Sequence, residues 1–366
     1  MVDKPELYAG LMSGTSLDGI DAVLVDFSGN MPGLRATHYR PYDAELRQAL
    51  LAMHRPSGNE LHDASLLGNH LAQEYATAIA ALLQNAAFTP DNVRAIGCHG
   101  QTIRHRPDAG YTLQLGNAAL LAELSGITVV GDFRSRDIAA GGQGAPLAPA
   151  FHQQVLRHPD IHRVIVNIGG ISNLTDLPPQ GAVTGFDCGP GNMLMDAWTM
   201  QHLGQPYDTD GKWAASGTVL PELLNTLMRE PFLSTPPPKS SGRELFNQQW
   251  LERHLSGNEA PADVQATLLA LSVHAIADAV REHCQGAHEI YLCGGGARNP
   301  VLSRQLAAAL PACTIQATDT LGVDADWMEA MAFAWLAQQA MHGNRIDLSA
   351  ITGAHHPCIL GAIYQA

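Results

Sequence analysis

The sequence predicts an α/β protein with two similar domains, and three observations lead to this prediction. Its 366 residues, 46% of them hydrophobic and 15% charged, are enough to bury two separate cores. Short runs rich in β-branched residues alternate with longer segments of helical spacing. Residues 7–27 and 164–177 also share one pattern, in which glycine and hydroxyl residues separate two apolar runs. Such a weak internal repeat suggests duplicated domains that face each other.

The first of these segments is the most informative. Its apolar runs have the pattern of a β-hairpin, and the turn between them reads Gly14-Thr15-Ser16-Leu17-Asp18-Gly19. Glycines relax the backbone there, and successive N–H groups can converge on an anion. We therefore predict a phosphate-binding hairpin, with Asp18 or Asp21 available to a hydrated Mg²⁺. An ordinary glycine-rich hairpin with a solvated aspartate explains the same residues equally well.

Two helices are expected next, over residues 44–53 and 64–83, because apolar residues recur there at helical spacing. Asp43 and Asp63 are the expected N-caps, since a carboxylate oxygen can accept from the first backbone N–H groups of a helix. Short apolar runs then predict three strands, at residues 93–97, 111–115 and 127–131.

Polar residues stand directly after two of these strands. His99 and Gln101 follow the first, and Arg134 with a second arginine follows the third, just before the glycine-rich residues 141–146. Because ligands lie beyond strand ends in open α/β sheets, His99 and Gln101 are candidate site residues. In an acidic protein the arginines are candidates for binding a carboxylate or phosphate. The alternatives are loop backbone contacts for the first pair and surface ion pairs for the arginines.

The second hairpin repeats the pattern of the first, with Gly169-Gly170 between its apolar runs and Ser172 and Asn173 directly after them. Asp187 follows in the chain and has glycines close on both sides, so that a ligand could approach it. A catalytic carboxylate is one interpretation of Asp187. The other is a helix cap or an Asx-turn, which are common roles for aspartate among glycines.

The C-terminal half contains a proline- and glycine-rich stretch, residues 206–258, which we interpret as an irregular insertion. Helices are expected at residues 193–200, 263–283, 301–310 and 326–342, and a strand at residues 290–292. That strand ends in Gly294-Gly295-Gly296, which permits close approach of a flat ligand such as a purine. A tight turn into the next helix is the alternative. Glu329 lies near the start of the last helix, where the helix dipole favours an ionised carboxylate.

Composition excludes several classes of function. A formal net charge of −14 argues against a nucleic-acid-binding surface, which would need a basic stripe. No apolar run is expected to reach membrane-spanning length, and residues 1–6 lack the features of a signal peptide, so we expect a cytoplasmic protein without a membrane partner. The six cysteines form no CxxC pair, which suggests reduced core thiols rather than zinc ligands. Neither GxxxxGK[ST] nor GxGxxG occurs.

Two glycine and hydroxyl hairpins followed by a strand and three glycines resemble the superfamily of sugar kinases, acetate kinase, heat-shock chaperone ATPases and actin. Within it the sequence looks specifically like the anhydro-N-acetylmuramic acid kinase family. The motifs that carry this resemblance span nearly the whole chain: residues 12–19, 98–102, 131–134, 142–147 and 167–171, Asp187 with residues 189–192, and residues 294–296. Two positions depart from the pattern, because Met12-Ser13 stands where the superfamily commonly has an aspartate and Cys188 where we expect threonine.

The resemblance implies two RNase H-like α/β domains with mixed sheets flanking an interdomain ATP cleft, as in actin and hexokinase. We expect an N-terminal domain of residues 1–145, completed by about residues 346–366. Residues 146–345 would form the C-terminal domain that binds nucleotide and sugar, with the insertion at about residues 206–258. A homodimer with no nucleic-acid partner is expected.

The implied activity is ATP-dependent phosphorylation of 1,6-anhydro-N-acetylmuramic acid on O6, with water opening the anhydro ring, in peptidoglycan amino-sugar recycling. The cofactors would be ATP and Mg²⁺. We assign Asp187 as the base that activates water, with Glu329 orienting the water or a sugar hydroxyl. ATP would contact Gly14, Thr15, Ser16, Leu17, Asp18, Gly19, Ile20, Asp21, Gly169, Gly170, Ser172, Asn173, Gly294, Gly295, Gly296 and Asn299. The sugar would contact His99, Gln101, Arg134, Gly189 and Asn192, and the metal Asp18.

Two other functions fit the same residues. One is a kinase of the same fold that acts on another small acceptor. The other is an actin-like or regulatory protein that binds nucleotide without turnover.

Overall fold

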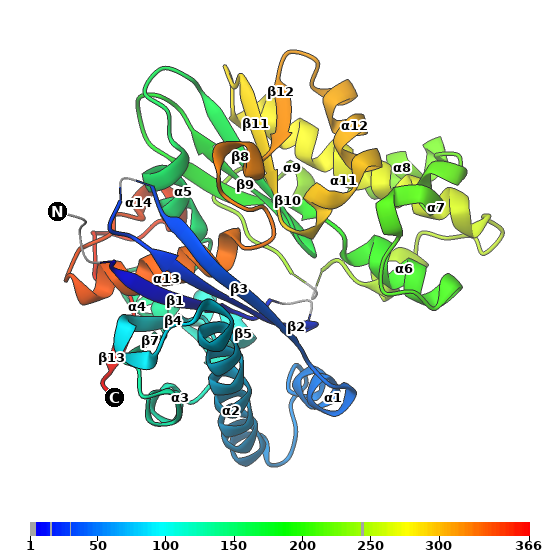
Figure 1. Ribbon diagram of the computed structural model, residues 1–366. Helices are drawn as coiled ribbons and strands as arrows, with labels where there is room; N and C mark the ends of the chain where they lie inside the picture. Colours follow the sequence, from blue (N-terminus) through cyan, green and yellow to red (C-terminus); the bar gives the residue numbers. More distant parts are fainter. Residues whose placement is uncertain (1–4, 15–16, 30, 243–244) are drawn as a thin grey trace. The chain divides into compact units, whose positions relative to one another are not determined.

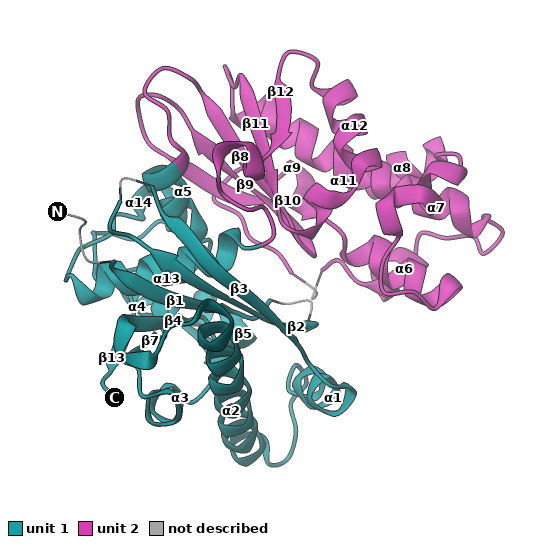
Figure 2. Ribbon diagram, in the orientation of Figure 1, with its two compact units in different colours: residues 1–155, 327–366 teal, residues 156–326 magenta. Residues whose placement is uncertain are grey.

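The computed structural model describes the whole chain except residues 1–4, 15–16, 30 and 243–244. Contacts within it divide the protein into two compact units (Figures 1 and 2). Unit 1 consists of Met1–Val155 and Trp327–Ala366, and unit 2 of Leu156–Asp326. Unit 2 is therefore an insertion in the sequence of unit 1.

Unit 1 is built on a mixed sheet that has six strands in the described residues, in the order β13-β7-β4-β1-β2-β3. β1, β2 and β3 are antiparallel neighbours, β4 runs parallel to β1, and β7 runs parallel to β4. The strands are β1 (Leu7–Met12), β2 (Gly19–Asp26), β3 (Gly33–Pro41), β4 (Val93–Cys98), β7 (Val129–Gly131) and β13 (Ala362–Tyr364). A separate small sheet pairs β5 (Gln101–Arg106) with β6 (Tyr111–Leu115).

Unit 2 repeats this arrangement. Its sheet has the order β10-β9-β8-β11-β12. β8, β9 and β10 are antiparallel neighbours, and on the other side of β8 lie β11 and β12, which run parallel to it. The strands are β8 (Arg163–Ile168), β9 (Ile171–Leu177), β10 (Thr184–Pro190), β11 (Glu289–Cys293) and β12 (Thr314–Ala317). The matching strands of the two sheets have the same order and the same relative directions, so the prediction of two similar α/β domains with mixed sheets is confirmed. Both predicted hairpins, β1–β2 and β8–β9, also form.

The two faces of the unit 1 sheet are covered by helices that are distant in sequence (Figure 1). Helix α2 packs on the face that carries Leu7, Ala9 and Leu11, through residues such as Leu71 and Ile79. The helices of this unit are α1 (Ala44–Ala52), α2 (Glu60–Ala86), α3 (Ala118–Ser125), α4 (Phe133–Ala139), α5 (Ala148–Leu156, which ends in unit 2), α13 (Met328–Met341) and α14 (Ser349–Thr352).

Helix α13 lies on the opposite face, directly over two strand glycines. A Cβ atom at Gly10 would overlap the carbonyl oxygen of Ala330, and one at Gly97 would overlap that of Phe333. Only glycine permits this separation of helix and sheet. We predicted that residues 327–345 belong to the C-terminal domain, but this helix belongs to unit 1 because its packing partners are β1 and β4.

The core of unit 2 lies between its sheet and helix α11. Val166, Leu174 and Phe186 point from the strands into a cluster with Leu268 and Ile276 of that helix. The helices are α6 (Met193–Leu203), α7 (Lys212–Ser216), α8 (Pro221–Leu227), α9 (Pro231–Ser234), α10 (Gln248–Glu252), α11 (Pro261–His283) and α12 (Pro300–Ala309). The predicted irregular insertion thus contains several short helices.

Two local expectations are wrong. Helix α11 is long and apolar enough to cross a membrane, contrary to the expectation that no such run exists, but 83% of its most apolar window is buried inside the structure. It is the central core helix of unit 2. Asp43 caps α1 as predicted, since its side chain accepts from Leu46 N, whereas α2 begins after Asn59 and therefore places Asp63 inside its first turn.

Candidate active site

In unit 1, the turn between β1 and β2 is held by side chains that come from other elements. Gln101 donates from Nε2 to the carbonyl oxygen of Gly14 (3.0 Å), and Ser13 Oγ donates to that of Gly100 (3.1 Å). Ser13 Oγ also lies 2.8 Å from the hydroxyl of Tyr75 on α2. Leu17 has a left-handed backbone (φ 57°) and a buried side chain, which anchors the far end of the turn. The predicted contacts of Thr15 and Ser16 lie outside the described residues.

Asp18 and Asp21 stand at the end of this hairpin. Asp18 is exposed, and its backbone carbonyl accepts from Tyr42 N (2.9 Å). Partial burial and then the two carboxylates raise the pKa of Tyr39 to about 12, so both aspartates lie near that ring. No group of three or more potential protein ligands surrounds a metal position in the described residues. The pair suits Mg²⁺, which usually takes one or two carboxylates and keeps several waters.

His99 and Arg134, both predicted as site residues, contact each other. Arg134 donates to His99 Nε2 from Nε (3.1 Å) and lies 2.9 Å from it through Nη2, and its Nη1 donates to the carbonyl oxygen of Gly144 (2.8 Å). Burial, and then the guanidinium, lower the pKa of His99 well below its usual value, so the imidazole is neutral at pH 7. Asp137 accepts from Gly144 N (2.7 Å) and from Thr352 Oγ1 (2.8 Å), which fixes the glycine-rich loop beside Arg134.

In unit 2, the Gly169-Gly170 turn is held by backbone. Gly170 O accepts from Gly191 N (2.9 Å) and Met193 N (3.2 Å), and Gly169 O accepts from Asn192 N (2.8 Å). Asn192 Nδ2 donates to the carbonyl oxygen of Ile168 (3.1 Å). A Cβ at Gly191 would overlap Gly169 O, which explains the glycine there. The predicted residues 189–192 are thus brought against the second hairpin.

The three-glycine turn lies at the same end of β8. Gly294 has φ 76° and a Cβ there would overlap Asn167 Oδ1, while a Cβ at Gly296 would overlap the side chain of Ile168. Gly294 N donates to the carbonyl oxygen of Ala325 (2.8 Å). Asn299 caps α12, since its Oδ1 accepts from Val301 N (3.1 Å) and Leu302 N (3.2 Å). In unit 2 the structure therefore brings together both glycine turns and Asn192.

Asp187 lies on β10, in a row of polar residues across the sheet. It pairs with Asn173 on β9, which pairs with Asn167 on β8, so the three side chains share one face. The register shifts between Asp187 and Gly189, which makes Cys188 a bulge residue whose side chain enters the core. The expected threonine hydroxyl at this position would be buried among apolar side chains. Sequence reasoning missed Asn167, although a polar residue at a strand end was a usable signal.

Residues 239–241, here called the strap, hold Asp187 from the insertion. Asp187 N donates to the carbonyl oxygen of Lys239 (3.1 Å), and Ser241 N donates to Asp187 Oδ2 (2.8 Å). Lys239 Nζ donates to the carbonyl oxygens of Phe232 (3.0 Å) and Leu233 (2.9 Å), and lies 4.8 Å from the centre of the Phe232 ring. Burial lowers the pKa of Lys239, opposed by nearby Cys188, Glu282 and Asp187. Asp187 is therefore held by long-range contacts, which an Asx-turn or a helix cap does not require.

Glu329, the second predicted catalytic residue, lies in the first turn of α13, in unit 1, and is half-buried. Its backbone position favours the ionised carboxylate through the helix dipole. The six cysteines are free thiols, five of them buried.

Comparisons with known proteins agree on one family. A family model described as anhydro-N-acetylmuramic acid kinase matches residues 6–366. Proteins of that name from Nitrosospira multiformis and Thiobacillus denitrificans are 59% and 58% identical to this chain, and each alignment covers 99% of it and at least 98% of the relative. A solved ROK family glucokinase from Streptomyces griseus, in complex with glucose and AMPPNP, aligns with a TM-score of 0.43 at 12% identity, covering 91% of this chain and 99% of that one. On the strength of the sequence matches, the chain belongs to the anhydro-N-acetylmuramic acid kinase family.

Proposed function

We propose that this protein is an ATP-dependent kinase that converts 1,6-anhydro-N-acetylmuramic acid and water into N-acetylmuramic acid 6-phosphate, with release of ADP. Family membership supports the kinase activity and the class of substrate. The observation that carries the mechanism is the strap, which fixes a carboxylate on a strand bulge at the end of the sheet that bears both glycine turns of unit 2. Bulges of this kind commonly aim a side chain at a site.

Asp187 is the base in this mechanism. It removes a proton from water, whose oxygen bonds to the anomeric carbon while the bond from that carbon to O6 breaks. O6 then bonds to the γ-phosphorus, and ADP leaves. An inverting glycosidase would need a general acid for the departing oxygen, but here the phosphoryl group takes that role, so one base is sufficient. Glu329 is assigned to orient the water or a sugar hydroxyl.

The phosphates of ATP are assigned to the N–H groups of the two glycine turns. Carbonyl oxygens of Gly169 and Gly170 are bound by the 191–193 backbone, which fixes the turn in one orientation before the nucleotide binds. Ser172 and Asn173 follow on β9, and the Gly294–Gly296 turn with Asn299 is assigned to the adenosine. Mg²⁺, held by Asp18 through water or directly, would neutralise charge on the transferring phosphoryl group.

The sugar is assigned to His99, Gln101, Arg134, Gly189 and Asn192. Its lactyl carboxylate needs a cation, and Arg134 supplies one on a fixed helix. A neutral His99 accepts from that guanidinium and so holds its orientation. We also propose that the protein acts in the cytoplasm as a homodimer, in recycling of peptidoglycan amino sugars. Sedimentation of the pure protein tests the dimer, which a monomer at micromolar concentration would exclude.

Turnover in ¹⁸O-labelled water is the decisive experiment. Mass spectrometry should find one labelled oxygen at the anomeric carbon and phosphate on O6, formed with the same stoichiometry as ADP. Equal ATP consumption with acetate or with N-acetylmuramic acid would instead indicate a kinase of broader acceptor range. ATP binding without ADP release in the presence of the anhydro-sugar would indicate a nucleotide-binding protein without turnover, and ring opening without ATP a plain glycosidase.

A further inference from the structure

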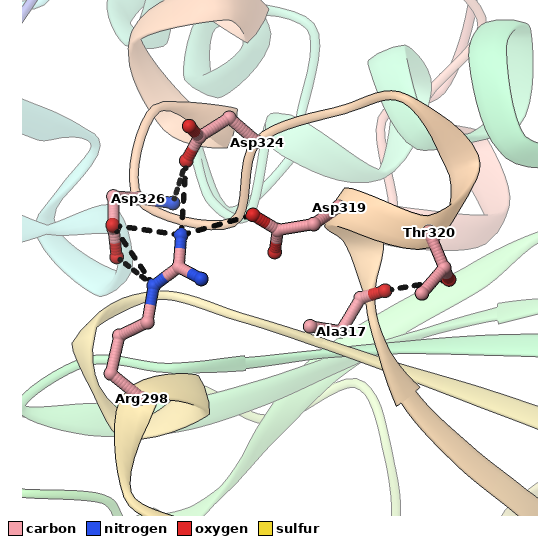
Figure 3. Close-up of polar contacts among 6 residues, drawn as sticks. All are labelled: Arg298, Ala317, Asp319, Thr320, Asp324 and Asp326. Atoms are coloured by element: carbon pink, nitrogen blue, oxygen red, sulfur yellow. Dashed lines mark hydrogen bonds and ion pairs between the residues drawn. The ribbon is translucent and has the colours of Figure 1, made fainter.

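Arg298 is the last residue of the short 3₁₀ turn that begins in the three glycines, and it is surrounded by three carboxylates (Figure 3). Its Nη2 lies 3.1 Å from Asp319 Oδ1, 3.3 Å from Asp324 Oδ1 and 2.9 Å from Asp326 Oδ2. Its Nε also donates to both oxygens of Asp326 (3.2 and 3.0 Å). All three aspartates belong to residues 319–326, here called the crossing segment, which is the last part of unit 2 before the chain enters unit 1.

Both ends of the glycine turn are tied to this crossing segment. At the start of the turn, Gly294 N donates to Ala325 O (2.8 Å), and at its end Arg298 holds the aspartates. Within the segment, Asp326 N donates to Asp324 Oδ1 (2.9 Å), so the acceptors of Arg298 are themselves ordered. The turn from Gly295 to Arg298 is a single 3₁₀ helix, too short to keep its shape without such contacts.

The charges on this cluster argue against phosphate binding, which is the simplest role for an arginine near a nucleotide. One guanidinium among three carboxylates leaves a negative cluster, which would repel a phosphate rather than attract it. Hydrogen bonding and attraction to Asp326, and then to Asp319, raise the pKa of Arg298 further above its usual value, so the cation persists at every relevant pH. A single surface ion pair contributes little to the free energy of folding. One planar guanidinium that binds three carboxylates, however, fixes the positions of the segments that carry them.

We propose that Arg298 is a positioning residue for ATP: it locks the Gly294–Gly296 turn onto the crossing segment and so presents a preformed surface to the adenosine. This inference rests on the proposed function of the turn. The crossing segment continues into α13, whose first turn carries Glu329, so the same lock fixes the chain leading to that carboxylate. Arg298 touches neither substrate in this account and acts through the turn.

The test compares Arg298→Ala with Arg281→Ala in the full-length protein. Arg281 is a matched control, because its side chain is 48% exposed against 47% for Arg298 and it pairs with one carboxylate, Asp278. Arg298→Ala should raise the KM for ATP about tenfold and leave the KM for the anhydro-sugar within about twofold. Arg298→Lys should recover only part of this loss, since one ammonium cannot reproduce the fork. Arg281→Ala should match the wild type in both KM values.

Hydrogen exchange of the Gly294 amide distinguishes two effects of the Arg298→Ala substitution, namely local release of the glycine turn from the crossing segment and a general loss of stability. Arg298→Ala should speed this exchange at least tenfold without nucleotide, while peptides from β8 keep wild-type rates. Adding Asp324→Asn and Asp326→Asn to Arg298→Ala should not restore ATP binding, because neutral side chains still lack the tether. Full restoration would show that Arg298 only neutralises charge and would overturn the proposal, as would an unchanged KM for ATP. Failure of the wild type to turn over would reject the proposed function instead, and the exchange result would still stand.

Discussion

In unit 1 the β1–β2 turn spans residues 13–18 and is fixed by side chains from β5 and α2, whereas in unit 2 the β8–β9 turn is two glycines fixed by three backbone hydrogen bonds. The helices differ in the same sense. Helix α13 rests on Gly10 of β1 and Gly97 of β4, while β8 and β11, the matching strands of unit 2, contain no glycine. The counterpart of α11 in unit 1 is α2, since each connects the third strand of its sheet to the fourth, and both pack through larger side chains. One topology is therefore stabilised in two ways, and mutations should affect the two units differently.

The largest expected effect concerns the carboxylate that only unit 2 carries on a bulged strand. Asp187→Asn should lower kcat by about 1,000-fold, because an amide cannot accept the proton, while Ser241 and the strap still hold the side chain. The dissociation constant for ATP should stay within about twofold. Steady-state kinetics and calorimetry measure both, with Asp210→Asn, an exposed aspartate of the same unit, as control. Normal turnover of Asp187→Asn would remove it from the role of base.

The second prediction concerns the glycines under α13. Gly97→Ala should reduce the free energy of unfolding by about 3 kcal/mol, because the new Cβ forces helix and sheet apart. Gly58→Ala is the control, since nothing lies within 4 Å of a Cβ there and its φ is not in the left-handed region, so it should change stability by less than about 0.5 kcal/mol. Urea denaturation measures both. Equal stability of the two variants would contradict the close packing of α13.

Acid should destabilise unit 1 through the buried His99 and His152 and the half-buried His105. Burial lowers the pKa of His105 to about 4 and that of His152 to about 3, and burial with Arg134 lowers that of His99 well below 6.5. The unfolded chain binds protons at these sites at higher pH than the folded protein does, so the free energy of unfolding is highest above pH 6.5 and falls as the pH decreases. At pH 5 the loss is about 2 kcal/mol each for His105 and His152, and His99 adds to it in the same direction. Hydrogen exchange between pH 7 and 5 should show unit 1 opening more readily. His152→Phe should reduce the pH dependence, and an unchanged profile would contradict it.

Arg134→Ala should raise the KM for the anhydro-sugar about tenfold, since a charge-assisted hydrogen bond to the carboxylate is lost, with little change in the KM for ATP. The control is Arg136→Ala, an exposed arginine on the same helix. The variant also removes the positive charge that helps to lower the pKa of His99, so it should be assayed at pH 8, where that histidine is neutral in either case. An unaltered sugar KM would count against this assignment.

The smallest effect compares two buried serines, each 1% exposed. Ser13→Ala removes a side-chain support of the first turn and should raise the KM for ATP about threefold to fivefold. Ser272→Ala removes the donor to Gly191 O (2.8 Å), but the backbone bonds of the second turn remain, so the change should be less than twofold. A larger effect at Ser272 would reverse the distinction between the two turns.

Local patterns predicted most of the fold. Both hairpins, the strand that ends just before His99, and the three-glycine turn were readable because residues close in sequence determine them. The strand β10 that carries Asp187 was not predicted. The unit to which α13 belongs could not be predicted from local patterns, because it depends on glycines in β1 and β4 that lie more than 200 residues earlier in the chain. The strap was missed for a similar reason, since Lys239 lies in a segment without periodicity. The helix α11 was predicted to within two residues, but its membrane-spanning length and apolarity were not recognised, because occasional polar residues interrupt its apolar positions.

The interrupted sequence of unit 1 has a consequence for how this protein is made. When residue 155 leaves the ribosome, β1 and β4 are complete, but the helix that covers Gly10 and Gly97 is still untranslated, as is the edge strand β13. Unit 2 is contiguous and can fold during synthesis, whereas unit 1 must wait for nearly the last residue with one sheet face uncovered. A circular permutant that begins at Trp327 would make unit 1 continuous and remove that delay.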